Sequence, residues 1–217
     1  MIRTCFAFFV AFSICNALAT AKLVDELSSE QLQTLKGGQL VKKIEDVADN
    51  TWPRVTIYQT VRATPEEVMA VFIDYVNAKE FTPDVISSEI AKVISPKVKE
   101  VDYVVKVPLL ANESYAVRNT LTSLGDASYR VSWTMLRSTY MKSGTGDFTV
   151  EPFNGGTLMR HTSLTEPGSK LVAPLKGFAL TQVEKTVASL KNYIEKMKSS
   201  QPQKLNDLVS QLNAALK

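Results

Sequence analysis

Six segments of β-type residues, separated by short turns, follow one another between Val85 and Gly168. The turn Asn154-Gly155-Gly156 is a strong signal for a hairpin, because its residues accept the backbone conformations that tight reversals need. Strands at this even spacing with short connections are typical of an antiparallel meander. The sequence therefore predicts an antiparallel sheet over this part of the chain.

A long amphipathic helix is predicted directly after the last strand, over residues 170–200. Apolar side chains recur at the spacing of one helix face, and lysines and glutamates occupy the other positions. This pattern predicts a helix that buries one face. The apolar face consists of Val172, Leu175, Ala179, Val183, Thr186, Leu190, Ile194 and Met197.

A strand and two short helices are predicted before the meander. Apolar and polar side chains alternate in residues 52–63, as they do along a strand. Thr64 is a natural N-cap, Pro65 suits the first helical position, and Glu67 completes a capping box. The helix that follows has apolar residues on two stripes, so we expect it to be covered on both sides. A second short helical turn is expected to end before Pro83.

Further elements are predicted at the two ends of the chain. A short helix capped by Ser28 or Ser29 is expected to end at Gly37-Gly38, and a short strand follows it. Residues 199–217 form a tail that is interpreted as either a docking helix or a frayed end.

The order of these elements predicts an α+β fold. A strand, two short helices, six antiparallel strands and one long helix are best accommodated by a curved antiparallel β-sheet wrapped around the long C-terminal α-helix. The two short helices after the first core strand would plug one end, and the first of them would lie between the sheet and the long helix. Such a sheet leaves a void beside the helix, so a tunnel is expected.

The first 21 residues resemble a secretory signal peptide. Arg3 precedes an apolar run that is too short for a comfortable membrane span, and small residues close it. We expect cleavage after Ala21, with Ala19 as the alternative position. A lipoprotein signal is disfavoured because Ile14 precedes Cys15, and a signal anchor is a further alternative. The protein is therefore expected to be exported, either to a periplasm or out of the cell.

Removing 21 of the 217 residues leaves 196, and both cysteines are lost with the peptide. The mature chain therefore lacks disulfides, thiolate metal sites and cysteine nucleophiles. Losing Arg3 lowers the net charge from +3 to +2, with both signs interspersed. This charge balance is not that of a nucleic-acid-binding protein. We also expect the protein to be a monomer.

Four phrases of the sequence, in this order, resemble the START-like (SRPBCC, helix-grip) superfamily. They are "ATPEEVMAVFIDYVNAKEFTP", "VKVPLLANESYAVRNTL", "GDFTVEPFNGGTLMRHT" and "EPGSKLVAPL". Within it, the chain is similar to polyketide cyclase/dehydrase and coenzyme Q-binding START-type proteins. The resemblance implies a helix-grip domain over residues 52–198, after an N-terminal extension of residues 22–51.

One phrase departs from the family pattern. Many members have an Asp-Arg-Asp-Tyr type phrase in the turn before the aromatic residue, whereas this chain has Asn112, Glu113, Ser114 and Tyr115. The basic residue of that phrase is therefore missing. The family's ligand preference therefore does not carry over at this position.

The resemblance implies a hydrophobic ligand, since members of the superfamily bind lipids, sterols, quinones or polyketides in the tunnel. We expect a carrier or sensor, because the sequence has no recognisable catalytic constellation, metal motif or cofactor motif. One alternative is a cyclase or hydrolase that uses His161 or Glu113 as a general base. The other is an interaction module with a filled core.

The side chains that line the tunnel are predicted from strand parity and from the helix stripe. Alternating residues of each strand face one side, and the wall they form is apolar with a few polar points, which suits a hydrophobic ligand with one polar group. The glycines Gly144 and Gly146 would either allow close packing or leave room for the ligand. The predicted lining residues are Tyr103, Tyr115, Asn119, Trp133, Met135, Phe148, His161, Leu175, Phe178 and Gln182.

The tunnel entrance is predicted in the segment before the long helix. Pro167-Gly168 and Gly177 weaken the regular structure there. An apolar mouth could also make transient contact with a membrane. The alternative is that these residues only seat the helix. The residues expected at the mouth are Leu171, Val172, Leu175 and Phe178.

Overall fold

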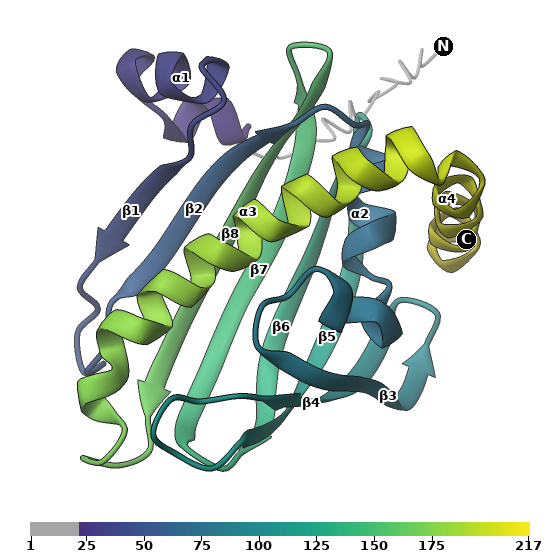
Figure 1. Ribbon diagram of the computed structural model, residues 1–217. Helices are drawn as coiled ribbons and strands as arrows, with labels where there is room; N and C mark the ends of the chain where they lie inside the picture. The colour runs from purple at the N-terminus through teal and green to yellow at the C-terminus, as the bar shows by residue number, and fades with distance from the viewer. Residues whose placement is uncertain (1–21) are drawn as a thin grey trace, which may run out of the picture.

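An antiparallel sheet curves around one long helix in the computed structural model, which describes residues 22–217 (Figure 1). The predicted signal peptide, residues 1–21, lies outside the described residues. The strand order is β1-β2-β8-β7-β6-β5-β4-β3, so the predicted meander is confirmed. The strands are β1 (Val41–Glu45), β2 (Arg54–Val61), β3 (Val85–Ser95), β4 (Val98–Val105), β5 (Glu113–Gly125), β6 (Ser128–Ser138), β7 (Met141–Phe153) and β8 (Gly156–Pro167).

The predicted helices are present, and the helix-grip fold is confirmed. None of the helices among residues 22–217 combines the length and the apolarity that crossing a bilayer would require. The α-helices are α1 (Ser29–Lys36), α2 (Pro65–Phe72), α3 (Lys176–Ser200) and α4 (Pro202–Leu216). Short 3-10 helices cover Leu23–Glu26, Tyr75–Glu80 and Ala173–Leu175.

The start of α2 has the capping box that its sequence predicts. The backbone N–H of Glu67 donates to the Thr64 hydroxyl at 3.3 Å, and the Glu67 carboxylate accepts from the Thr64 N–H at 2.7 Å. Helix α1 starts in the same way at Ser28 and ends at Gly37. These local signals therefore set where both helices begin.

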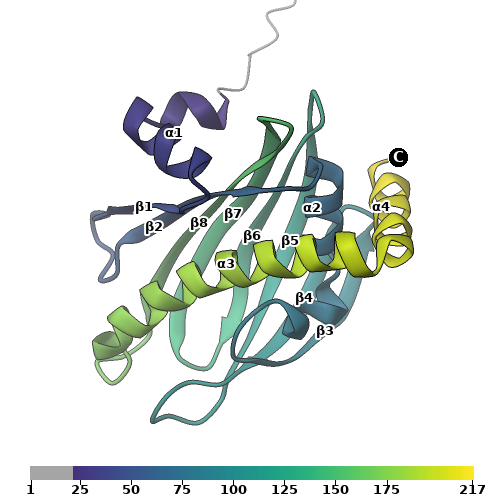
Figure 2. The ribbon, with the colours of Figure 1, turned by 45° about the horizontal axis from the view of Figure 1, so that its top comes forward.

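The sheet is covered on both faces near β2 and β8. Figure 2 shows α1 and α3 on opposite sides of the sheet. Met159 of β8 lies in the main core on the α3 side, whereas its neighbour Leu158 packs with Leu35 and Tyr58 under α1. For this reason β8 has apolar residues on both of its faces. The alternation of apolar and polar residues therefore could not show which face its other residues occupy.

The tail forms helix α4 and covers α2. Helix α2 packs on β6, β7, β8 and α3, as expected, but α4 makes its most extensive helix contact (Figure 1). Leu205, Leu208 and Leu212 of α4 are buried in the main core. The early helix is therefore enclosed by the tail as well as by the sheet and the long helix.

Candidate functional site

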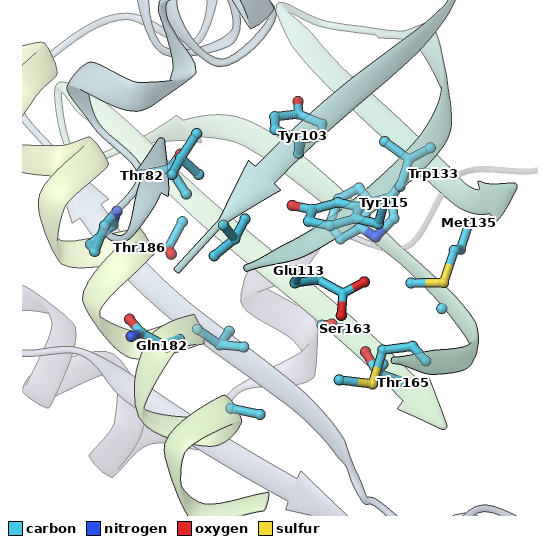
Figure 3. A pocket seen from close by; sticks show the side chains of 18 of the residues that line it. Thr82, Tyr103, Glu113, Tyr115, Trp133, Met135, Ser163, Thr165, Gln182 and Thr186 are labelled. Atoms are coloured by element: carbon cyan, nitrogen blue, oxygen red, sulfur yellow. The ribbon is translucent and has the colours of Figure 1, made fainter. Parts of the chain in front are cut away.

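A cavity of about 360 Å³ lies between α3 and the concave face of the sheet. Aromatic and aliphatic side chains make up most of its wall, and Figure 3 shows side chains of the sheet and of α3 on opposite sides of it. The structure places all but one of the predicted lining residues there. These are Tyr103, Tyr115, Asn119, Trp133, Met135, His161, Leu175, Phe178 and Gln182.

Phe148 is the exception, because it does not line the cavity. Its side chain is fully buried and stacks on Phe72 of α2, with ring centroids 4.0 Å apart. Phe72 lies in the cavity wall in its place. The predicted face of β7 is correct, but α2 plugs the sheet at the height of Phe148 and separates this ring from the cavity.

Several lining residues were not predicted, although strand parity could have found some of them. Glu113 precedes Tyr115 by two positions in β5, and both line the cavity. Ser163 and Thr165 follow His161 at the same spacing in β8. Residues of the 3-10 helix Tyr75–Glu80 and of the segment after it also line the cavity, and no periodicity in the sequence points to them.

Two pairs of rings contribute to the aromatic part of the wall. Tyr103 and Tyr115 are cross-strand partners whose rings stack with centroids 5.1 Å apart. Burial raises the pKa of both hydroxyls, so both remain hydrogen-bond donors at neutral pH. The Trp133 ring lies against His161 at a centroid distance of 5.0 Å.

The two glycines of β7 seat side chains of the neighbouring strand. A Cβ at Gly146 would lie 2.3 Å from the Trp133 ring and 2.2 Å from the carbonyl oxygen of Thr162. A Cβ at Gly144 would lie 2.8 Å from the terminal methyl of Met135. The glycines therefore allow close packing, and they do so for cavity-wall side chains of β6.

Four lining residues have a buried polar atom with no hydrogen-bond partner among residues 22–217. Unpaired buried polar atoms are uncommon in folded proteins. Gln182 also uses its amide to donate to the carboxylate of Asp84, a contact that links α3 to the start of β3. The unpaired atoms are Oε2 of Glu113, Nδ2 of Asn119, Nδ1 of His161 and Oε1 of Gln182.

His161 is kept neutral by its surroundings. Burial among apolar groups lowers its pKa to about 4, and the negative charge of Asp147 opposes this shift only in part. Among residues 22–217, Nδ1 also has no partner that would stabilise an added proton. At neutral pH the imidazole can donate one hydrogen bond and accept one.

The folded protein is expected to lose stability as the pH falls from about 6.5 to about 4. The unfolded chain takes up a proton on His161 at its ordinary pKa of about 6.5, but the folded chain resists protonation until about pH 4. Urea unfolding at pH 7.5 and pH 4.5 measures the loss. His161→Gln should lose less stability than the wild type between these two pH values, and an equal loss in both proteins would contradict the assignment.

The residues expected at the entrance lie in the cavity wall, apart from Leu171. Val172 of the segment before α3 and Phe178 of α3 line the cavity, but the Leu171 side chain is 67% exposed and does not line it. The Trp52 indole donates to the carbonyl oxygen of Ala173 at 3.2 Å, which ties this segment to the start of β2. Leu171 is therefore not part of the cavity wall.

Comparisons with known proteins agree with this architecture. Residues 53–196 match the family described as "Polyketide cyclase / dehydrase and lipid transport". A STAR-related lipid transfer protein fragment from Xanthomonas axonopodis is 16% identical, with a TM-score of 0.64, and the match covers 71% of this chain and 93% of that one. Human StAR-related lipid transfer protein 5 is 13% identical, with a TM-score of 0.60, and the match covers 73% and 83% of the two chains.

An enzyme is among the similar structures as well. The Zhui aromatase/cyclase from Streptomyces sp. R1128 is 14% identical, with a TM-score of 0.54, and the match covers 66% of this chain and 94% of that one. A search of curated proteins found no match. At these identities, the structural similarities show a shared fold.

Proposed function

Because the chain belongs to the polyketide cyclase/dehydrase and lipid transport family, we propose that it carries or senses a hydrophobic molecule in the cavity between α3 and the sheet. The observation that supports this most directly is the cavity itself. Its volume of about 360 Å³ and its apolar wall with few polar groups are those of a small-molecule site. A lipid, quinone, sterol or polyketide-like molecule would fit this chemistry.

Filling the cavity is expected to weaken ligand binding at least about tenfold, since the added side chain would occupy the ligand's space. Ala179 of α3 lines the cavity, so Ala179→Trp is the test variant. Fluorescence titration with N-phenyl-1-naphthylamine measures the affinity. Asn192→Trp adds the same side chain at an exposed position of the same helix and should leave the affinity unchanged.

Native mass spectrometry of protein purified from its own host shows whether a small molecule is bound. A bound apolar molecule supports the proposal. Protein that carries none, and that also fails to bind the fluorescent probe, would indicate an interaction module with a filled core.

An enzyme of the cyclase or hydrolase type is the second candidate. The arrangement that favours it is that Glu113 and His161, the two groups able to act as general base, line one cavity. Incubating the extracted ligand with the protein and measuring its mass distinguishes the two functions. A carrier returns the ligand at its original mass, whereas a hydrolase or a dehydrating cyclase changes the mass by that of water.

We propose further that the protein is exported, on the basis of the signal-peptide pattern of residues 1–21. Protein isolated outside the cytoplasm should begin at Lys22, or at Thr20 for the alternative cleavage position. Cytoplasmic protein that still begins at Met1 would refute export.

The ligand is proposed to enter at the end of the sheet formed by the β4–β5 loop and the β8–α3 loop. Each loop exposes one leucine, Leu109 at 99% and Leu171 at 67%, and Figure 1 shows both loops at the same end of the sheet. Lys106 and Lys170 are exposed in the same loops. Apolar tips beside lysines suit transient contact with an anionic membrane.

Replacing both exposed leucines is expected to reduce binding to vesicles of phosphatidylcholine and phosphatidylglycerol at least about tenfold, because full burial of each side chain contributes about 1.5–3 kcal/mol and about 1.4 kcal/mol corresponds to a factor of ten. The variant is Leu109→Ser with Leu171→Ser, and vesicle cosedimentation measures the bound fraction. Val93→Ser is the control, since Val93 is 61% exposed but lies at the far end of β3. Equal loss in the control would contradict contact through the two loops.

A further inference from the structure

The wall of the cavity contains one carboxyl group among the described residues, that of Glu113. Among the described residues that line the cavity, Glu113 is the only one with an ionisable acid or base other than tyrosine and His161. No lysine or arginine of residues 22–217 lines the cavity. A ligand inside therefore meets one acidic group and no cation.

Glu113 is held in place by one of its oxygens and leaves the other free. Oε1 accepts from the Ser138 hydroxyl at 2.7 Å and from the Thr139 N–H at 2.9 Å. These donors lie at the end of β6 and in the turn after it, so the carboxylate is fixed where β5 begins. The residue is 6% exposed, and Oε2 has no partner among the described residues.

The direction of the side chain completes the arrangement. Figure 3 shows the Glu113 carboxylate pointing toward Met135 and Ser163 and away from Gln182, all of which line the cavity. A buried carboxylate oxygen without a donor is unfavourable, and a ligand that supplies a donor removes this cost. In the ionised carboxylate, Oε2 carries no hydrogen, so it can accept a hydrogen bond but cannot donate one.

We infer that the cavity takes an apolar molecule whose polar end donates a hydrogen bond to Glu113, namely a hydroxyl or an ammonium group. A carboxylate or phosphate at this position would bring negative charge against Glu113 with no cation in the wall to offset it. An ether or a ketone at this position would present only hydrogen-bond acceptors to Glu113 and no hydrogen-bond donor. The inference rests on the proposed function and narrows its ligand class.

Four ligands with the same chain and different ends test this selectivity. They are 1-decanol, decylammonium, 1-methoxydecane and decanoate, titrated by calorimetry into protein from which any copurified ligand has been extracted. The two donors should bind about tenfold more tightly than the ether or the carboxylate, which is the usual effect of a hydrogen bond to a charged group. Equal affinities, or tightest binding of decanoate, would overturn the inference.

Glu113→Gln should remove the charge preference while keeping the shape of the side chain. Decylammonium is expected to lose about tenfold in affinity, and decanoate should lose its disadvantage. Glu100→Gln is the matched control, because Glu100 lies on β4 in an ion pair with Arg118 and outside the cavity wall. It changes the net charge by the same amount and should leave all four affinities within about twofold of the wild type.

The outcomes separate this inference from the proposed function. If N-phenyl-1-naphthylamine binds but none of the four ligands does, the inference is wrong and the apolar cavity site stands. If the fluorescent probe also fails to bind, both the inference and the proposed function are wrong. If Glu113→Gln does not fold, as judged by circular dichroism, the ranking of the four ligands on the wild type decides.

Discussion

Replacing Leu212 with alanine is expected to lower the free energy of unfolding by about 2–5 kcal/mol. The Leu212 side chain is fully buried in the main core, together with Leu205 and Leu208 of the same helix. Truncating it removes apolar contacts and leaves a cavity between α4 and the elements it covers. Urea unfolding followed by circular dichroism measures the loss.

Gln211→Ala provides the control for this change. Gln211 is the exposed neighbour of Leu212 on α4, and its replacement should alter the free energy of unfolding by no more than about 0.5 kcal/mol. If both variants unfold like the wild type, α4 does not stabilise the domain. A chain that ends at Ser200 should lose still more stability than Leu212→Ala, because it uncovers α2.

Replacing Gly146 with alanine is expected to destabilise the protein by about 1–3 kcal/mol or more and to weaken ligand binding as well. The added Cβ would lie 2.2 Å from the Thr162 carbonyl oxygen, so the backbone of β7 or β8 must move. It would also lie 2.3 Å from the Trp133 ring and push that ring toward the cavity. Thermal unfolding and titration with N-phenyl-1-naphthylamine report the two effects separately.

The matched control is the same substitution at Gly177. An added Cβ there has no heavy atom within 4 Å, and the residue is exposed in the first turn of α3. Gly177→Ala should leave stability unchanged or raise it by up to about 1 kcal/mol, since alanine favours helix. A similar loss at both glycines would show that close packing under Trp133 is not the cause.

Arg118 and Arg160 of the sheet do not form a joint anion-binding pair. The two residues lie on β5 and β8, which are not adjacent strands. Arg118 pairs with Glu100 at 2.7 Å, and Arg160 pairs with Asp147 at 2.7 Å and with Glu26. The two guanidinium groups therefore serve separate ion pairs.

The order and type of the elements could be predicted from the sequence because the signals for them are local. The capping box at Thr64 acts over three residues, and the helical stripe of α3 repeats along one segment. Alternation along a strand likewise identified the face that carries Tyr115, Trp133 and Met135, all of which lie in the cavity wall.

Only the tertiary structure decided what lies over each face at each height of the sheet. Phe148 has the predicted parity but lies beneath Phe72 of α2, because the position of α2 depends on contacts between distant segments. The enclosure of α2 by α4 and the covering of Leu158 by α1 arise in the same way. Alternation reports that a side chain is buried, whereas whether it meets a cavity or another helix depends on packing, which no local repeat encodes.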